Sequence, residues 1–185
     1  MKNIMDDVGK VLVSEAEIDK IVTRIAAEID RDYQDKDGNL VLVCILKGSI
    51  VFMGDLMKKI TVPVEIDCIK VSSYGQGTES SGQIHIALDL IRPDIRNCNL
   101  LLIEDIIDSG VTLSHLTKYL ELKGAKSVRT CTLLDKPSRR KVNFTPDYCG
   151  TEIPDEFVIG YGLDYAEKYR ALPFVGVLKP EVYTK

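Results

Sequence analysis

The sequence contains no tryptophan and only two histidines, His85 and His115. So few imidazoles argue against a histidine metal cluster and against most catalytic triads, which depend on a histidine base. The five cysteines stand singly, mostly within apolar runs, so their spacing matches neither a zinc motif nor a disulfide framework. Cysteines of this kind are typical of small buried residues in a reducing compartment, and we expect a cytoplasmic protein.

Long apolar runs and an excess of positive charge are also lacking. No run approaches the roughly 20 apolar residues that span a bilayer, and the first residues lack the charged-then-apolar pattern of a signal peptide. Lys and Arg number 24 against 28 Asp and Glu, which gives a net charge of −4. Because general nucleic-acid binders are usually basic, we do not expect nucleic acid as a partner. The lack of a long apolar run likewise leads us to expect no membrane partner.

The 185 residues are 45% hydrophobic, which suits the core of a single domain, 1–185. A capping box, Ser14 to Glu17, precedes the first of three helical patterns. These helical patterns alternate with apolar runs, and the alternation predicts an α/β fold with a central, mostly parallel sheet flanked by helices. The expected helices are 18–29, 50–60 and 113–122, and the expected strands are 40–46, 64–71, 83–90, 100–103, 127–134, 156–162 and 174–178.

The most informative stretch is 100–113, in which an apolar strand ends in two adjacent carboxylates, Glu104 and Asp105. A short loop, 108–112, then leads into a helical pattern. Backbone N–H groups at a helix start favour an anion such as phosphate. Two adjacent carboxylates repel each other unless hydroxyls or Mg²⁺ bridge them. The pattern predicts a site for a phosphorylated sugar, although Asp108 alone also fits an ordinary helix N-cap.

Polar residues also follow two other predicted strands, at the end where ligands bind in an open parallel sheet. Lys47 fits either a cation that meets phosphate or a solvated lysine at a turn. Lys136 follows the 127–134 strand, and beyond it Arg139 and Arg140 fit a solvated turn or a subunit contact better. The polar segment 72–82 fits either a plain hairpin loop or a lid.

The residues 102–112 resemble the ribose-phosphate loop of the type I phosphoribosyltransferases: an apolar strand, an acidic pair, two apolar residues, Asp, a small residue, Gly, any residue and Thr. The segments 46–49, 73–75, 134–140 and 153–165 are similar, in order, to the bacterial hypoxanthine-guanine branch of that family. The resemblance implies the type I phosphoribosyltransferase fold with a small hood formed by N- and C-terminal segments. It also implies a homo-oligomer, dimer or tetramer, that acts on small molecules.

The resemblance implies purine salvage: Mg²⁺-dependent transfer of the 5-phosphoribosyl group from 5-phosphoribosyl 1-pyrophosphate (PRPP) to hypoxanthine or guanine, giving IMP or GMP and pyrophosphate. Asp108 would be the catalytic base or acid at the purine nitrogen, a role typically worth about 10² to 10⁴ in rate. The resemblance also implies that Glu104 and Asp105 bind the ribose and a metal ion, and that the 5-phosphate is bound by Asp108, Ser109, Gly110, Val111 and Thr112. Pyrophosphate would be bound by Lys47, Gly48 and Arg170, beneath a lid that contains Ser73 and Tyr74. The purine would be bound by Lys136, Phe157, Val158 and Asp164, and Asp164 would also contact a second metal ion. In this family the peptide between Leu46 and Lys47 can be cis.

Three alternatives remain open at this point. A cationic donor at Lys136 suits a 6-oxo purine, and an unpaired buried donor costs about 1–3 kcal/mol, so adenine is disfavoured but xanthine stays possible as a minor substrate. A regulatory nucleic-acid binder on the same fold needs a basic face, which the net charge of −4 disfavours. A signalling receiver domain needs a shorter chain and leaves Gly110 unexplained.

Overall fold

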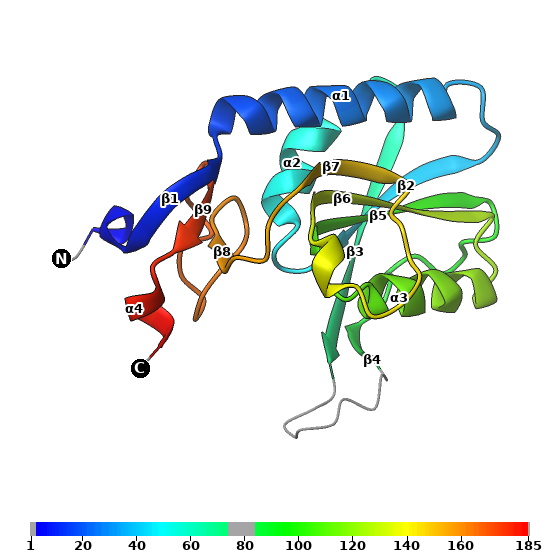
Figure 1. Cartoon of the computed structure of the whole chain (residues 1–185). Helices are drawn as coiled ribbons and strands as arrows, with labels where there is room; N and C mark the ends of the chain where they lie inside the picture. The colour runs from blue at the N-terminus through cyan, green and yellow to red at the C-terminus, as the bar shows by residue number, and fades with distance from the viewer. Residues whose placement is uncertain (1–2, 74–83, 185) are drawn as a thin grey trace.

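A six-stranded sheet forms the centre of the computed structural model, which describes residues 3–73 and 84–184 (Figure 1). The strand order is β4-β3-β2-β5-β6-β7. Neighbouring strands from β3 to β7 are parallel, and only β4 runs antiparallel to β3. The mostly parallel sheet predicted from the sequence is therefore confirmed. Its strands are β2 (Asn39–Ile45), β3 (Val64–Ser73), β4 (Ile84–Leu88), β5 (Cys98–Ile107), β6 (Ser127–Asp135) and β7 (Tyr148–Glu152).

Helices cover both faces of this sheet, with α1 (Glu15–Tyr33) and α2 (Ile50–Met57) on one side and α3 (Val111–Leu122) on the other (Figure 1). Alternate side chains of β2 serve the two faces: Leu42 and Cys44 pack in the cluster with α1 and α2, whereas Val41 and Val43 pack in the cluster with α3. This two-sided burial explains why β2 and β5 are unbroken apolar runs in the sequence. None of the described helices is long and apolar enough to cross a bilayer.

A second, three-stranded sheet forms the hood beside the main sheet, in the order β1-β9-β8 (Figure 1). Its strands are β1 (Val8–Val13), β8 (Val158–Ile159) and β9 (Val175–Leu178), so they come from both ends of the chain, as the resemblance implies. Three short helices, η1 (Ile4–Asp7), η2 (Pro137–Arg139) and α4 (Pro180–Tyr183), complete the structure.

The expected elements differ from the observed ones in number and in bounds. The prediction of a strand over 156–162 is wrong in length: β8 has two residues, because Gly160, Tyr161 and Gly162 all have positive φ and turn the chain. Strands β1 and β7 were not predicted at all. Helix α2 ends at Met57, earlier than expected, and α3 begins at Val111, two residues before the expected start.

The segment considered for a lid falls largely outside the described residues. Ser73 is the last residue of β3, and Tyr74 lies outside the described residues.

Candidate active site

The parallel sheet brings three of the predicted strand ends together. Strand β5 pairs with β2 on one side and β6 on the other, so Lys47, the stretch after Ile103 and Lys136 all lie at the carboxyl edge. The backbone N–H of Lys136 donates to the carbonyl of Ile107 at 2.9 Å. Lys136 Nζ also lies 3.9 Å from Asp108 Oδ1, so two candidate functional groups from different strands face each other.

The Glu104–Asp105 pair is buried at the end of β5. Asp105 is 7% exposed, and Glu104 Oε2 is buried and accepts no hydrogen bond from the described residues. Burial, and then the charge of Asp105, raise the pKa of Glu104 well above its usual value; burial also raises the pKa of Asp105. A Cβ on Gly48 would come within 1.7 Å of Asp105 Oδ2, so only glycine fits beside this carboxylate.

This donor set fits a divalent cation that is shared with a substrate. Mg²⁺ is commonly held by one or two carboxylates together with substrate phosphates and water. Within residues 3–73 and 84–184, three or more carboxylate, imidazole or thiol groups do not gather into a metal-binding cluster. Asp164 has both oxygens engaged, Oδ1 with Arg170 at 2.8 Å and Oδ2 with the N–H of Glu167 at 2.9 Å. Glu104 and Asp105 therefore fit Mg²⁺ as they stand, whereas Asp164 must first release one of these contacts.

The loop 108–112 encloses a cavity of about 110 Å³ between the end of β5 and the start of α3. Gly110, at φ 77°, is the N-cap of α3, so Asp108 is not the cap. Ser109 Oγ accepts from the N–H of Val111 at 3.3 Å, and the carbonyl of Ser109 accepts from the N–H of Lys141 at 3.0 Å. The cavity at a helix start is the geometry expected of an anion site.

Arg140 anchors this loop, which corrects the interpretation of Arg140 as part of a solvated turn. Its side chain is only 17% exposed and forms an ion pair with Asp135. The same guanidinium donates to the carbonyl of Asp108. No local sequence signal separates Arg140 from its neighbour Arg139, because the distinction depends on β6 lying beside β5.

The side chain of Asp108 is held near cations without being neutralised by direct contact. Its Oδ1 is buried and accepts no hydrogen bond from the described residues, and its Oδ2 lies 3.9 Å from Arg139 NH1. Arg139 bonds more closely to Asp155, at 2.9 Å. Asp108 therefore offers an oxygen that is free to exchange a proton with a ligand.

Lys136 and Phe157 form a second part of the site, beneath the hood. The side chain of Lys136 is 7% exposed, and its ammonium donates to the carbonyl of Glu156 at 2.7 Å. Phe157 is 40% exposed and stacks on Tyr183, with ring centroids 5.0 Å apart. Val158, which follows Phe157 directly, is the first residue of β8. A planar ligand at Phe157 would thus lie within reach of a buried cationic donor.

The residues predicted to bind pyrophosphate also lie together. The peptide between Leu46 and Lys47 is cis. Lys47 Nζ lies 3.0 Å from Glu167 Oε2, and Arg170 NH2 lies 2.8 Å from Asp164 Oδ1. Glu167 was not predicted as part of this site, since it is 120 residues from Lys47 and its polar segment carries no local signal.

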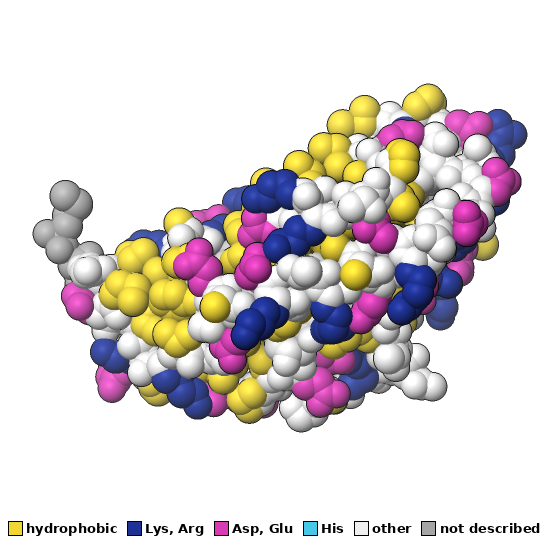
Figure 2. Space-filling view, turned by 90° about the horizontal axis from the view of Figure 1, so that it is seen from above, with side chains coloured by type: hydrophobic (Ala, Val, Ile, Leu, Met, Phe, Trp, Pro, Cys, Tyr) yellow, Lys and Arg dark blue, Asp and Glu magenta, His cyan; other side chains and the backbone are white. Residues whose placement is uncertain are grey.

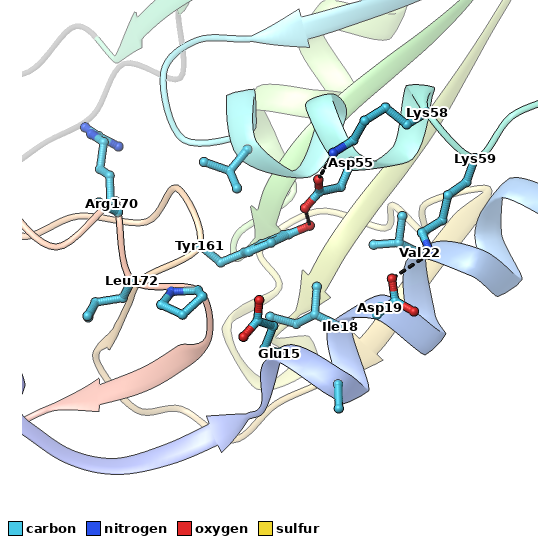
Figure 3. Close-up of a pocket in the computed structure, with 14 residues that line it drawn as sticks. Glu15, Ile18, Asp19, Val22, Asp55, Lys58, Lys59, Tyr161, Arg170 and Leu172 are labelled. Atoms are coloured by element: carbon cyan, nitrogen blue, oxygen red, sulfur yellow. Dashed lines mark hydrogen bonds and ion pairs between the residues drawn. The ribbon is translucent and has the colours of Figure 1, made fainter.

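A larger cavity, of about 810 Å³, lies between α1, α2 and the segment 161–173 (Figure 3). The charged groups on its wall are engaged with other lining residues. Lys59 forms an ion pair with Asp19 at 2.6 Å, and Asp55 accepts a hydrogen bond from the hydroxyl of Tyr161 at 2.7 Å. Arg170 points away from the other labelled side chains, and its guanidinium takes part in the site at Lys47. Within residues 3–73 and 84–184, Arg170 is the one predicted site residue that borders this cavity.

The fold and the strand-end site define the class of protein. The family model of the phosphoribosyl transferase domain matches residues 12–166, and the chain belongs to that family. It is 50% identical over 177 residues to the hypoxanthine-guanine phosphoribosyltransferase of Bacillus subtilis, covering 96% of this chain and 97% of that protein. The crystal structure of a hypoxanthine phosphoribosyltransferase from Staphylococcus aureus is similar over 100% of both chains, with a TM-score of 0.93 and 47% identity.

The same region occurs within a longer protein in another bacterium. The chain is 46% identical over 184 residues to the bifunctional protein TilS/HprT of Listeria monocytogenes. It covers 28% of that protein's length.

Proposed function

We propose that this protein is a purine-salvage enzyme, which transfers the 5-phosphoribosyl group from PRPP to hypoxanthine or guanine. The products are IMP or GMP and pyrophosphate. The observation that carries the proposal is the juxtaposition of the Glu104–Asp105 pair, the 108–112 cavity and Lys136 at one sheet edge. The relatives that bear the names of hypoxanthine-guanine enzymes support the choice of purine.

The donor substrate would occupy the edge of β5. Glu104 and Asp105 bind the ribose hydroxyls, and the N–H groups and hydroxyls of 108–112 bind the 5-phosphate. Glu104, Asp105 and, once one of its contacts is released, Asp164 hold Mg²⁺, which would neutralise charge on the departing pyrophosphate. Lys47, Gly48 and Arg170 bind the pyrophosphate itself and add positive charge where the leaving group becomes more negative.

The acceptor purine would stack on Phe157 with its 6-oxo group on Lys136, while the backbone carbonyls of Val158 and Asp164 bind the ring edge. The purine nitrogen forms a bond to C1′ of the ribose as the bond from C1′ to pyrophosphate breaks. Asp108 accepts the proton that this nitrogen loses, and it lies 3.9 Å from Lys136. Adenine is disfavoured because its 6-amino group is itself a donor, so the N–H of Lys136 that points at the purine has no acceptor.

The proposal includes a homo-oligomer, dimer or tetramer. Ile50 and Met57 on α2 and Ile66 on β3 are large apolar side chains that are 53%, 39% and 56% exposed. Apolar side chains exposed on neighbouring elements are typical of a surface that another subunit covers.

The absence of nucleic acid as a partner, and a cytoplasmic location, are also part of the proposal. In Figure 2, hydrophobic side chains gather at one end and along one long edge of the face seen from above, while basic and acidic side chains are interspersed over the rest of that face. The face in this view is therefore not the basic face that a nucleic-acid backbone requires, and the net charge of −4 also disfavours such a partner. All five cysteines are free thiols, as a reducing cytosol favours.

The test is an assay with PRPP and Mg²⁺ against hypoxanthine, guanine, xanthine and adenine in parallel. We expect product with hypoxanthine and guanine, and little or none with adenine. If neither hypoxanthine nor guanine is converted, the proposal is overturned. A clear preference for xanthine would make xanthine the acceptor purine. Omitting Mg²⁺ in the presence of a chelator should abolish turnover.

A further inference from the structure

Glu167 places a carboxylate between the two cations that the proposed function assigns to pyrophosphate. Its Oε2 lies 3.0 Å from Lys47 Nζ and 3.5 Å from Arg170 NH2. These two cations come from segments far apart in the chain, the turn after β2 and the loop before β9. Glu167 Oε2 contacts both cations, so it occupies the position that an oxygen of pyrophosphate would need in order to bind Lys47 and Arg170.

The backbone around Glu167 aims this carboxylate at Lys47. Ala166 and Glu167 have φ of 51° and 62°, a left-handed conformation that residues other than glycine adopt at a cost. The N–H of Glu167 donates to Asp164 Oδ2 at 2.9 Å, and Tyr165 and Lys168 exchange backbone hydrogen bonds at 3.2 and 3.1 Å. The turn is thus closed by its own hydrogen bonds, which hold the side chain over the cations.

The ion pair is strong enough to form and weak enough to exchange. The side chains of Lys47 and Glu167 are 52% and 66% exposed, and exposed ion pairs are typically worth about 0.2–1 kcal/mol. The hydrogen bond from Lys47 lowers the pKa of Glu167, so the carboxylate is ionised throughout the neutral range. Pyrophosphate carries more charge than a single carboxylate and therefore competes for the same cations.

We propose that Glu167 acts as a built-in competitor for pyrophosphate: its carboxylate neutralises Lys47 and Arg170 in the ligand-free protein, leaves when PRPP binds, and returns as pyrophosphate departs. This inference rests on the proposed function, since it takes the same cations as the pyrophosphate site. Glu167 touches no reacting atom in this scheme and is a positioning residue that controls access to the cations.

The test compares pyrophosphate binding, by calorimetry, between the unaltered protein and the variant Glu167→Gln. The variant removes the competing charge and keeps the size of the side chain. Because exposed ion pairs are worth about 0.2–1 kcal/mol, we expect pyrophosphate and PRPP to bind about 1.4- to 5-fold more tightly. Product inhibition by pyrophosphate should strengthen by the same factor, and this gain should shrink as salt is added.

The control for net charge is Glu121→Gln, which alters an exposed acid on α3. It should leave pyrophosphate affinity unchanged. A second control combines Glu167→Gln with Lys47→Ala: without Lys47, the tightening caused by the glutamine should largely disappear. A role in folding alone predicts the opposite sign, because a damaged site binds its ligand more weakly.

The outcomes separate this inference from the function on which it rests. If the unaltered protein converts hypoxanthine but Glu167→Gln binds pyrophosphate equally well or more weakly, the inference is wrong and the function stands. If the unaltered protein neither binds pyrophosphate nor forms a nucleotide, the proposed function fails and the inference fails with it.

Discussion

Two regions at the same edge of the sheet differ in how firmly their ligand-binding groups are fixed. The loop 108–112 continues from β5, whose residues Leu100 to Ile103 are fully buried, and backbone hydrogen bonds and Arg140 tie it down. The segment 162–170 is closed by its own hydrogen bonds, but its charged side chains, Glu167 and Arg170, are engaged in ion pairs that are partly or largely exposed to water. It also contains three non-glycine residues with positive φ.

This difference suits the two ends of the proposed donor substrate. The ribose 5-phosphate stays bound throughout the reaction, and a preformed, partly buried cradle serves it. Pyrophosphate must leave, and exposed ion pairs that salt weakens can exchange with it. The molecule thus combines a rigid site for the ribose 5-phosphate with an exchangeable site for pyrophosphate. The following experiments test that contrast in order of decreasing effect.

The largest effect is expected at Asp108, within the rigid loop. Asp108→Asn should lower kcat by about 10² to 10⁴, because the amide cannot accept the proton of the purine nitrogen. PRPP binding should change little, since the backbone that holds the loop is untouched. Steady-state kinetics and calorimetry with PRPP check both quantities. The variant Asp155→Asn, which alters the other partner of Arg139, is the control; equal losses in turnover and PRPP affinity for Asp108→Asn would contradict the base role.

A smaller effect is expected at Lys136, which is attached to the rigid region through Ile107. Lys136→Ala should lower kcat/KM for hypoxanthine and guanine roughly 10- to 100-fold, as expected for a lost contact to a charged donor of about 1.5–3 kcal/mol. PRPP affinity should stay the same, and the exposed neighbour Lys141→Ala should behave like the unaltered protein. Unchanged base kinetics in Lys136→Ala would refute the 6-oxo contact.

The junction between the two regions is Gly162, whose Cβ, if present, would lie 1.9 Å from the carbonyl oxygen of Gly48. Gly162 also has φ 99°. Gly162→Ala should therefore lower the free energy of unfolding by about 1–3 kcal/mol and weaken pyrophosphate binding as the two loops separate. Urea unfolding measures the first quantity. Gly54→Ala is the matched control: it has open space around it and lies inside α2, where alanine stabilises a helix by up to about 1 kcal/mol. Equal stability of the two variants would contradict the close approach.

The smallest change in stability is expected from Glu104→Gln in the ligand-free protein. The raised pKa of Glu104 means that the folded protein binds this proton more tightly than the unfolded chain does. The unaltered protein therefore loses stability as pH rises from the usual carboxyl range toward the raised pKa. Glutamine removes that loss, so at pH 8 the variant should gain a few degrees in Tm, since roughly 1 kcal/mol moves the Tm of a domain of this size by about 2–4 °C.

The gain from Glu104→Gln should fade as pH is lowered toward the usual carboxyl range, while activity is lost at every pH. Thermal unfolding at pH 8 and pH 5 measures the difference, with Glu121→Gln as the control for an exposed acid. A variant that is less stable than the unaltered protein at pH 8 would show that the buried carboxylate costs the free protein nothing.

The sequence predicted the parts of the molecule in which one local pattern has one structural solution. The runs at β2 and β5 are apolar at every position because both faces are buried, and the Ser14 capping box forms as expected, with the N–H of Ser14 donating to Glu17 at 2.8 Å. The positions of Glu104, Lys47 and Lys136 at one edge follow from strand pairing. Their chemical roles stay predictions until the substitutions are made.

Other parts depend on partners that the sequence does not announce. Strand β1 is largely exposed and contains a glycine, and β7 is a short edge strand; both are set by the strands they pair with. The contact between Glu167 and Lys47 joins residues that only the completed fold brings together. The partners of Arg140 are the carboxylate of Asp135 and the carbonyl of Asp108, and no linear pattern in the sequence links these residues to Arg140.

The pairing of β1 with β9 has a consequence for synthesis on the ribosome. Val8 pairs with Leu178, so one of the first strands to be made waits for one of the last. Sequence separations this large are entropically slow to close, and domains otherwise begin folding from the N-terminal side as they emerge. The main sheet can assemble while β1 is still single. The hood, and with it the Phe157 side of the site, is completed only at the end, so a chain that stops early exposes an unpaired β1 edge.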